Sequence, residues 1–396
     1  MTEPQYSLDE IRTNVSRIDN EILKLLAERR QLSLEVAKSK IQTAKPVRDQ
    51  TREQALLLRL IETGKSLQLD AQYVTQIFHT IIEDSVLFQQ AFLQKIANPE
   101  SLQPVARVSF LGAKGSYSNL ASRSYFSKKQ TKLVELSCST FRDVLHMVEI
   151  GNADYGVLPI ENTSSGSINE VYDLLQHTSL SIVGEINQPI EHCLLAVADT
   201  KLEDIDTLYS HPQPHQQCSE YLHSMGNITQ EYCSSTAEAM KQVAELQQPN
   251  VAAIGNASSG ELYGLTPLKS NIANQQENYT RFIVVARKPV DVTSLIPAKT
   301  TLTMSTAQKA GSLVECLLVL RNLNINMTKL ESRPVIGNPW EEMFYVDVEE
   351  NLKSEVMQDA LEELTRLTRF IKVLGCYPSE NVKPVDPETG DLILRG

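Results

Sequence analysis

The sequence predicts a multidomain protein with an all-α domain over residues 1–96, an α/β domain over 105–285 and an α+β domain over 299–377. The first segment carries apolar residues at helical spacing and contains almost no glycine. The second alternates short apolar runs with helical patterns, and the third has the element order strand, helix, strand, strand, helix, strand. Polar stretches that contain proline separate the three domains, as is typical of linkers. Residues 378–396 are expected to form a flexible tail.

Composition and charge limit the class of protein. The hydrophobic content of 41% and charged content of 22% are ordinary for a soluble globular protein. No apolar run reaches the roughly 18 residues that a membrane span needs. The N-terminus, "MTEPQYSLDEIR", lacks the basic and apolar regions of a signal peptide. A net charge of −12 argues against a nucleic-acid surface. We therefore expect a cytoplasmic protein that binds neither membrane nor nucleic acid.

The cysteines and glycines indicate neither a metal nor a cofactor. The six cysteines lie far apart, with no C-x-x-C pair and no histidine at metal-ligand spacing, so we expect reduced and mostly buried thiols. Neither G-x-G-x-x-G nor a Walker-type loop occurs, so no nucleotide cofactor is expected. The cysteines are Cys138, Cys193, Cys218, Cys233, Cys316 and Cys376.

The first helix is long and carries a single apolar seam. "SLDE" (Ser7–Glu10) is a capping box, in which the hydroxyl and the carboxylate each satisfy a free backbone amide. The helix is expected to run to about Lys40, which is roughly 50 Å at 1.5 Å per residue. One small domain cannot cover that length, so a partner helix from a second copy is expected. The seam consists of Ile11, Val15, Ile18, Ile22, Leu25, Leu32 and Val36.

One position of this seam is occupied by a cation. The repeat calls for an apolar residue where Arg29 stands, and an unpaired buried guanidinium costs several kcal/mol, so it must meet an anion. Lys40 adds a second cation, and two further helices start near Asp49 and Asp70. The last helix carries Ser85 and, one turn later, a glutamine on the same side. Such a unit could enclose a small dianion. Alternatively, the arginine pairs with a buried glutamate and the unit only dimerises.

Three stretches decide between these alternatives. "AERRQLSLEVAKSK", "RDQTRE" and "IIEDSVLFQQ" resemble the all-helical chorismate mutases, in which long helices of two chains intertwine. Their reaction, chorismate to prephenate, is an intramolecular rearrangement, so the protein only needs to hold a coiled conformer and stabilise charge on the breaking ether bond. The resemblance implies that Lys40 and Gln89 donate to the ether oxygen and that Glu53 accepts from the ring hydroxyl. The implied catalytic residues are Arg12 (reaching the partner's site), Arg29, Lys40, Glu53 and Gln89, and the implied substrate-binding residues are Asp49, Arg52 and Ser85.

In the middle domain, small polar side chains gather where strands end. The stretch "GVLPIENTSSGSI" (156–168) is an apolar run followed by a carboxylate, an amide and three hydroxyls. Strand, loop and helix recur along this domain, which predicts a mainly parallel sheet, and ligands of such sheets bind beyond the carboxyl ends of the strands. Each polar residue alone is more often a helix cap. Together they predict an anion pocket, of which the polar cluster in this stretch is one wall. The residues in or just after the turns are Gly115, Ser116, Ser118, Asn162, Thr163, Ser164, Ser210 and Gln217.

A later strand, "NYTRFIVVA" (278–286), begins with Thr280 and Arg281. Taken alone, these are a β-branched strand residue and a surface charge. With "GAKGSYS", "PIENTSSG" and "YSHPQ", however, the strand resembles prephenate dehydratase, which has two α/β lobes around a cleft, similar to periplasmic binding proteins. The resemblance implies that Thr280 is catalytic and donates a hydrogen bond to the departing hydroxyl. It implies substrate binding by Ser116, Glu161, Asn162, Thr163, Ser164, Ser210, Gln217 and Arg281, although Glu161 could instead be a structural cap.

The C-terminal βαββαβ pattern contains two further signatures. "GSLV" and "ESRP" resemble the phenylalanine-binding signatures of ACT domains, although alanine is usual where Ser312 stands. The resemblance implies that phenylalanine acts as an allosteric inhibitor through differential affinity for two states. A dimerisation module without ligand is the alternative. The implied effector-binding residues are Gly311, Ser312, Leu313, Val314, Glu331, Ser332, Arg333 and Pro334.

The order of these motifs resembles the bifunctional chorismate mutase/prephenate dehydratases of phenylalanine biosynthesis. The resemblance implies chorismate and prephenate as substrates, phenylpyruvate as product, no cofactor, and a homodimer or larger homo-oligomer. Two other functions compete with this one. A non-catalytic aromatic-acid sensor would use the lobe pair and the ACT domain only for binding. A mutase fused to prephenate dehydrogenase would need NAD, and the sequence has no dinucleotide loop for it.

Overall fold

A computed structural model gives the structure of the chain. It describes residues 7–43, 45–99, 104–127, 131–275, 277–335 and 340–380, so the predicted tail lies outside the described residues from 381 onward. These residues form two compact units. The first contains the residues up to Pro99 and the short segment Thr293–Ile296, and the second contains the others up to Glu380. The predicted α/β and α+β domains fall within one unit, and the boundary between them stays a prediction.

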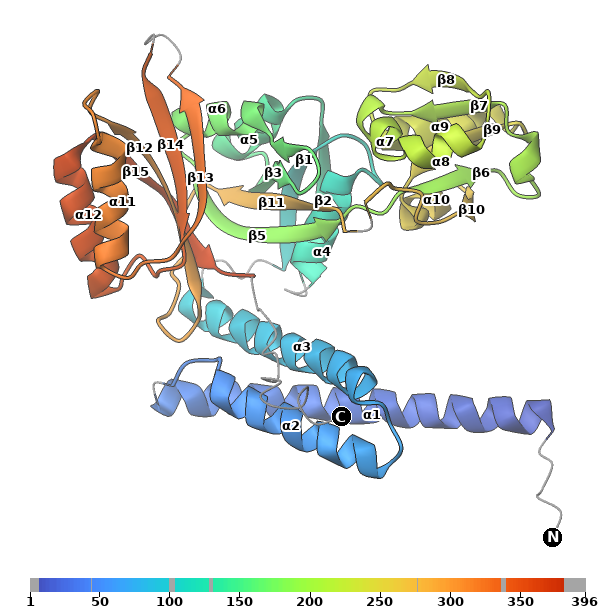
Figure 1. Ribbon diagram of the computed structural model, residues 1–396, viewed down its shortest axis with the longest axis horizontal. Helices are drawn as coiled ribbons and strands as arrows, with labels where there is room; N and C mark the ends of the chain where they lie inside the picture. The colour runs from blue at the N-terminus through green and yellow to red at the C-terminus, as the bar shows by residue number, and fades with distance from the viewer. Residues whose placement is uncertain are drawn as a thin grey trace, which may run out of the picture. The chain divides into compact units, whose positions relative to one another are not determined.

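The first unit contains three helices, α1 (Leu8–Thr43), α2 (Gln50–Ser66) and α3 (Ala71–Ala97) (Figure 1). Their predicted starts near Ser7, Asp49 and Asp70 are confirmed. The capping box forms at the N-terminus of α1. The amide of Ser7 donates to Glu10 Oε2 at 2.8 Å, and the amide of Glu10 donates to Ser7 Oγ at 3.3 Å. Asp49 and Asp70 cap the other two helices.

The apolar seam of α1 is exposed in the single chain. Only Ser33 and Ala37 are buried on this helix. The six seam residues from Ile11 to Leu32 are between 46% and 64% exposed. A continuous apolar stripe of this kind is typical of an interaction surface. The residues are Ile11, Val15, Ile18, Ile22, Leu25 and Leu32. Among the described residues, none of the helices combines the length and the hydropathy that a membrane span requires.

The second unit begins with a sheet of strand order β2-β1-β3-β11-β5, with the short β4 paired to β3 (Figure 1). β1 pairs in parallel with β2 and β3, whereas β11 is antiparallel to both β3 and β5. The strands are β1 (Val105–Leu111), β2 (Lys132–Cys138), β3 (Tyr155–Asn162), β4 (Gly166–Ser167), β5 (Ser181–Pro189) and β11 (Tyr279–Ala286). Its helices are α4 (Tyr117–Ser127), α5 (Phe141–Glu149) and α6 (Asn169–His177).

A second sheet has the order β10-β6-β9-β7-β8 and is also mixed. The predicted mainly parallel sheet is therefore wrong. The chain leaves the first sheet after β5 and returns as β11, which enters antiparallel between β3 and β5. The strands are β6 (Cys193–Ala196), β7 (Thr207–Ser210), β8 (Thr229–Tyr232), β9 (Val251–Gly255) and β10 (Thr266–Lys269). The helices are α7 (Pro212–Gln217), α8 (Ser219–Ser224), α9 (Thr236–Leu246) and α10 (Ala257–Leu262).

Two crossing segments join the sheets, residues 190–192 and, among the described residues, 270–275 with 277–278. They bond to each other, since the amide of Ile190 donates to Asn278 O at 2.8 Å and the amide of Ile272 donates to His192 O at 3.0 Å. Each sheet has its own apolar cores, so the two lobes are separate packing units joined by these segments.

The C-terminal part has the predicted βαββαβ order, which is confirmed. Its four strands form an antiparallel sheet of order β13-β14-β12-β15, and both helices cover one face (Figure 1). The other face packs on the first sheet, where Gly375 approaches the backbone so closely that a Cβ would lie 2.0 Å from Ile182 O. The elements are β12 (Ala298–Thr306), α11 (Ser312–Asn322), β13 (Met327–Pro334), β14 (Glu342–Val348), α12 (Glu355–Leu367) and β15 (Thr368–Pro378).

Candidate active sites

In the helical unit, Arg29 lies half-buried between α1 and α3. Its Nη1 donates to Ile81 O at 3.0 Å and also bonds to Ser85 Oγ. Burial lowers the pKa of the guanidinium, and the charge of Asp84 opposes this shift. Asp84 itself pairs with Arg30 at 2.7 Å. No described carboxylate forms a salt bridge with Arg29, so the alternative in which it pairs with a buried glutamate is not supported.

A second cation lies near the end of α1, beside the segment that leads to α2. Lys40 is half-buried and its Nζ donates to Val47 O. Burial lowers the pKa of the Lys40 ammonium, and the charge of Arg52 lowers it further, while Asp49 and Glu53 raise it. An anionic ligand would offset the burial cost of this ammonium.

The predicted residue Gln89 is 7% exposed and lies one turn beyond Ser85. Its Nε2 donates to Ser85 O at 3.1 Å, while its buried Oε1 has no partner among the described residues. Glu53 faces Arg48 at 3.3 Å, and both side chains are only 13% exposed. Asp49 accepts from the amide of Arg52 at 3.0 Å, so here it serves as a helix cap.

The structure does not bring Arg12 to the other predicted mutase residues. Its side chain is 71% exposed and faces Asp9 at 3.8 Å. It precedes Arg29 by 17 residues on one helix, which is about 25 Å. The remaining predicted mutase residues form the two groups just described. The first group contains Arg29, Ser85 and Gln89, and the second contains Lys40, Asp49, Arg52 and Glu53.

In the first sheet, Asn162 and Thr280 lie opposite each other on β3 and β11. They are 4% and 8% exposed, and Asn162 Nδ2 donates to Thr280 Oγ1 at 2.9 Å. The same Nδ2 lies 2.7 Å from Asn278 Oδ1. Asn162 Oδ1 accepts from the amides of Ser164 and Ser165 at 3.0 and 2.9 Å. The polar run after β3 is therefore a turn folded around one asparagine, which holds the threonine hydroxyl.

The neighbours of this pair come from both sheets. Thr163 Oγ1 accepts from the amide of Tyr279 at 2.9 Å, which ties the turn to β11. Gln213 Nε2 on α7 donates to Ser165 Oγ at 2.9 Å, so the turn also contacts the second lobe. Sequence reasoning missed Gln213 and Ser165 as partners, because they are 48 residues apart and no local pattern joins them.

The other predicted polar residues lie in the turns and helices that follow the strands, and several have structural partners. Ser116 Oγ donates to Leu111 O at 3.1 Å and accepts from the amide of Asn119 at 3.3 Å, so it closes the turn before α4. Ser118 and Ser210 are buried. Gln217, at the end of α7, bonds to His192 at 2.8 Å, a residue that sequence reasoning also missed.

The structure does not bring Arg281 together with the Thr280 side chain. Successive residues of a strand point to opposite faces, and Arg281 Nε and Nη1 instead reach Glu185 at 2.8 Å and Asp347 at 2.6 Å. Glu185 also accepts from Lys299 at 2.7 Å. The predicted substrate contact of Arg281 stays a prediction, and these contacts favour a role in joining β11 to the C-terminal sheet.

Glu161 is likewise engaged with the C-terminal sheet, since Lys329 Nζ lies 2.7 Å from its carboxylate. Lys329 also lies 3.3 Å from Glu331 in the "ESRP" stretch, and Glu331 accepts from Ser167 Oγ. Arg333 of the same stretch binds Asp173 on α6 through two bonds of 2.9 Å. The "ESRP" residues Glu331–Pro334 end β13, whereas "GSLV" opens α11, with Gly311 at a left-handed φ of 86°.

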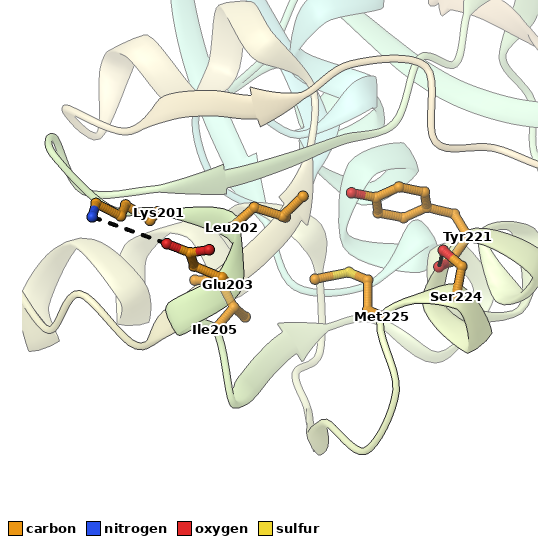
Figure 2. A pocket seen from close by; sticks show the side chains of 7 residues that line it. All are labelled: Lys201, Leu202, Glu203, Ile205, Tyr221, Ser224 and Met225. Atoms are coloured by element: carbon orange, nitrogen blue, oxygen red, sulfur yellow. Dashed lines mark hydrogen bonds and ion pairs between the residues drawn. The ribbon is translucent and has the colours of Figure 1, made fainter.

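A cavity of about 690 Å³ lies in the second lobe, beside α8. Figure 2 shows Lys201, Leu202, Glu203 and Ile205 on one side and the remaining lining residues on the other. None of the predicted site residues lines this cavity. The lining residues are Lys201, Leu202, Glu203, Ile205, Tyr221, Ser224 and Met225.

Comparisons with known proteins match both the helical unit and the two-sheet part of the second unit. Residues 11–90 match the family model of chorismate mutase type II, and residues 108–290 match that of prephenate dehydratase. A bifunctional chorismate mutase/prephenate dehydratase of Enterobacter agglomerans is 57% identical over 97% of this chain and 99% of the relative. That of Escherichia coli strain K12 is 56% identical over 95% of this chain and 97% of the relative.

Among solved structures, the prephenate dehydratase from Arthrobacter aurescens in complex with L-Phe superimposes with a TM-score of 0.63. The two proteins are 27% identical, and the match covers 72% of this chain and 94% of that one. The matches favour neither the sensor nor the dehydrogenase alternative. Because both family models match in this order and full-length relatives are more than half identical to it, the chain belongs to the bifunctional chorismate mutase/prephenate dehydratases.

Proposed function

We propose that the chorismate mutase and prephenate dehydratase activities of this chain reside in two sites, one in each unit. The mutase site is built around Arg29, Lys40 and Gln89. Glu53, together with Asp49 and Arg52, completes it. The dehydratase site is built around Thr280 and Asn162. The observation that carries the first assignment is a half-buried guanidinium without a described salt-bridge partner, because an anionic ligand would compensate the burial cost that the charge of Asp84 offsets only in part.

At the mutase site, the protein supplies donors where negative charge develops. As the ether bond of chorismate breaks, its oxygen becomes more negative, and Lys40 is suited to stabilise that charge. The second hydrogen on Gln89 Nε2 remains available beyond its bond to Ser85 O. Arg29 offers a fork that matches a substrate carboxylate. Binding of the coiled conformer by these groups accounts for catalysis without a covalent intermediate.

At the dehydratase site, the direction of one hydrogen bond supports the assignment. Thr280 Oγ1 accepts from Asn162 Nδ2, so its own hydrogen has no acceptor among the described residues and is available to a ligand. In the reaction, the bond from the ring to the carboxylate carbon breaks, its electron pair enters the ring, and the carbon–oxygen bond breaks to release hydroxide. Carbon dioxide departs and hydroxide takes up a proton to form water. A hydrogen bond from Thr280 would stabilise the departing oxygen.

We further propose that two copies pair through the α1 seam. The exposed apolar stripe supports this pairing. So does the separation of about 25 Å between Arg12 and Arg29 along α1, since a second chain could bring an arginine that one chain cannot. A cytoplasmic location is supported by the six cysteines, all of which are free thiols.

Feedback inhibition by phenylalanine through a C-terminal ACT domain is also proposed. The βαββαβ order and the contacts of "ESRP" with the dehydratase lobe support it, since Glu331 bonds to Ser167 and Arg333 to Asp173. The relative from Arthrobacter aurescens was solved in complex with L-Phe. An effector that displaced β13 would change contacts adjacent to the turn that holds Thr280.

One assay of the full chain tests the two active-site assignments together. The full chain is incubated with chorismate and without cofactor, and the concentrations of chorismate, prephenate and phenylpyruvate are measured over time. Arg29→Lys keeps the charge but loses the fork, and is expected to slow chorismate consumption about 100-fold while leaving turnover of added prephenate unchanged. Thr280→Val keeps the shape but loses the hydroxyl, and should accumulate prephenate. Normal phenylpyruvate formation by Thr280→Val would refute the role of the hydroxyl.

A further inference from the structure

His192 is a buried histidine that the reaction scheme above does not use. It is 1% exposed and lies in the first crossing segment, between β5 and β6, where the chain passes from one sheet to the other. Its carbonyl accepts from the amide of Ile272 in the second crossing segment at 3.0 Å. The ring is therefore fixed at the junction of the two lobes.

The imidazole bonds to one helix of each lobe. Its Nε2 lies 2.8 Å from Gln217 Oε1, at the end of α7. Its Nδ1 lies 3.2 Å from the hydroxyl of Tyr117, the first residue of α4, which also lies 2.8 Å from Glu191 O. The two rings meet edge to face, with centroids 5.9 Å apart. Tyr117 directly follows the predicted site residue Ser116, so His192 connects the turn that contains Ser116 with the predicted site residue Gln217.

The atoms around the His192 ring indicate which of its two nitrogens carries the hydrogen. A carbonyl oxygen only accepts, so the bond to Gln217 Oε1 requires the hydrogen on His192 Nε2. In the neutral ring Nδ1 then has no hydrogen, and the single hydrogen of the Tyr117 hydroxyl is shared between Glu191 O at 2.8 Å and Nδ1 at 3.2 Å. Burial lowers the pKa of His192, which keeps the ring neutral, and burial raises the pKa of Tyr117, which keeps its hydroxyl protonated.

This arrangement determines which end of the Gln217 amide is left for a ligand. Because the oxygen is bound to His192, the NH₂ group is the free end, and it has no hydrogen-bond partner among the described residues. Prephenate carries two carboxylates and a hydroxyl, all of which accept hydrogen bonds. If the histidine carried its hydrogen on Nδ1, the amide would turn over and present an oxygen to a dianion.

We propose that His192 is a positioning residue of the dehydratase, which holds the Gln217 amide with its NH₂ group toward the substrate through the bond from Nε2–H. This inference rests on the proposed role of Gln217 in binding prephenate. His192 thus sets the polarity of the binding site without touching the substrate, and it does so from the segment that joins the lobes.

Two isosteric amides at position 192 test the inference in the full chain. A glutamine places its NH₂ group near the ring Nε2 and keeps a donor to Gln217, whereas an asparagine reaches only as far as Nδ1. We expect KM for prephenate to stay within about threefold of wild type in His192→Gln and to rise about ten- to hundredfold in His192→Asn, since a buried polar partner is lost. Equal KM values for the two variants, with folding confirmed by circular dichroism, would overturn the inference.

Two variants of Gln217 separate this inference from the proposed role of Gln217 and do not require a change at the buried site. Gln217→Ala is expected to raise KM about tenfold. Gln217→Glu keeps an acceptor for His192 but presents a second oxygen to the substrate, so its KM should exceed that of Gln217→Ala. A normal KM in Gln217→Ala would refute the role of Gln217, and the inference with it. A raised KM in Gln217→Ala but a normal KM in Gln217→Glu would overturn the inference alone.

Discussion

At the scale of single residues, Asn162 and Thr280 could be proposed as site residues from the sequence because each lies in a compact motif, and the structure places them in contact. "IENTSSG" and "NYTRF" each occupy a few consecutive positions, and strand pairing sets Asn162 opposite Thr280. Adjacency in the sequence was misleading for Arg281, because strand alternation turns its side chain to the other face. His192 could not be found, since its partners lie 25 and 75 residues away and a lone histidine carries no pattern.

Asn162→Asp tests whether the direction of the bond to Thr280 matters. An aspartate has nearly the same shape but cannot donate, so the threonine hydroxyl would turn its hydrogen toward the carboxylate and away from the substrate. We expect the dehydratase kcat to fall about 100-fold, with chorismate consumption unchanged. Asn152→Asp, at an exposed turn, adds the same charge as a control and should be neutral. Steady-state rates with prephenate as substrate measure both, and a normal kcat in Asn162→Asp would contradict this role.

At the scale of elements, β11 is the strand whose placement the sequence did not predict. Its apolar run indicated a strand but not its direction, which follows from the return of the chain out of the second lobe. The charged cluster around Arg281 of this strand was also not predicted, because its members come from four strands. Glu185 lies on β5, Asp347 on β14 and Lys299 at the start of β12. Glu185 is 1% exposed and Lys299 3%, so this cluster is a buried polar link between the two sheets.

Lys299→Met measures what that link contributes to stability. The cluster contains two cations and two anions, so removing one ammonium leaves an uncompensated carboxylate in a buried site. We expect a loss of about 3–5 kcal/mol in the free energy of unfolding of the second unit. Lys353→Met removes an exposed lysine that pairs with Asp291 at 2.8 Å and should cost less than about 1 kcal/mol. Urea denaturation followed by circular dichroism compares them, and equal losses would show that the buried link adds no stability.

At the scale of the whole molecule, α1 carries a surface that one chain leaves uncovered. The seam and its arginine were predicted because heptad-like spacing is visible in sequence, and the exposure of Ile18 and Ile22 at 47% and 49% agrees with an interface role. The distance between Arg12 and the cations farther along the same helix also follows from their spacing, at 1.5 Å per residue. That distance makes the proposed mutase site depend on a second copy.

Charges placed in the seam test this dependence. Ile18→Glu with Ile22→Glu would set like charges against each other in a paired helix, so we expect dissociation to monomers and loss of mutase activity by about 100-fold or more. Asn20→Glu, about 200° around the helix from Ile18, is the matched control and should keep the assembly intact. Analytical ultracentrifugation and chorismate consumption measure the two effects. A monomer with full mutase activity would show that one chain completes the site.

Regulation by phenylalanine would link the C-terminal sheet to the dehydratase turn, and Asp173 offers a way to weaken that link without altering "ESRP" itself. Asp173 on α6 binds Arg333 through two bonds of 2.9 Å. Allosteric coupling is typically worth about 1–3 kcal/mol, so losing one bidentate contact should reduce inhibition several-fold at saturating phenylalanine. We therefore expect Asp173→Asn to bind phenylalanine with a Kd near wild type by calorimetry, yet to retain more dehydratase activity when saturated. Asp359→Asn, an exposed carboxylate on α12, should behave as wild type. If Asp173→Asn were inhibited as fully as wild type at equal occupancy, the contact between Arg333 and α6 would not carry the coupling.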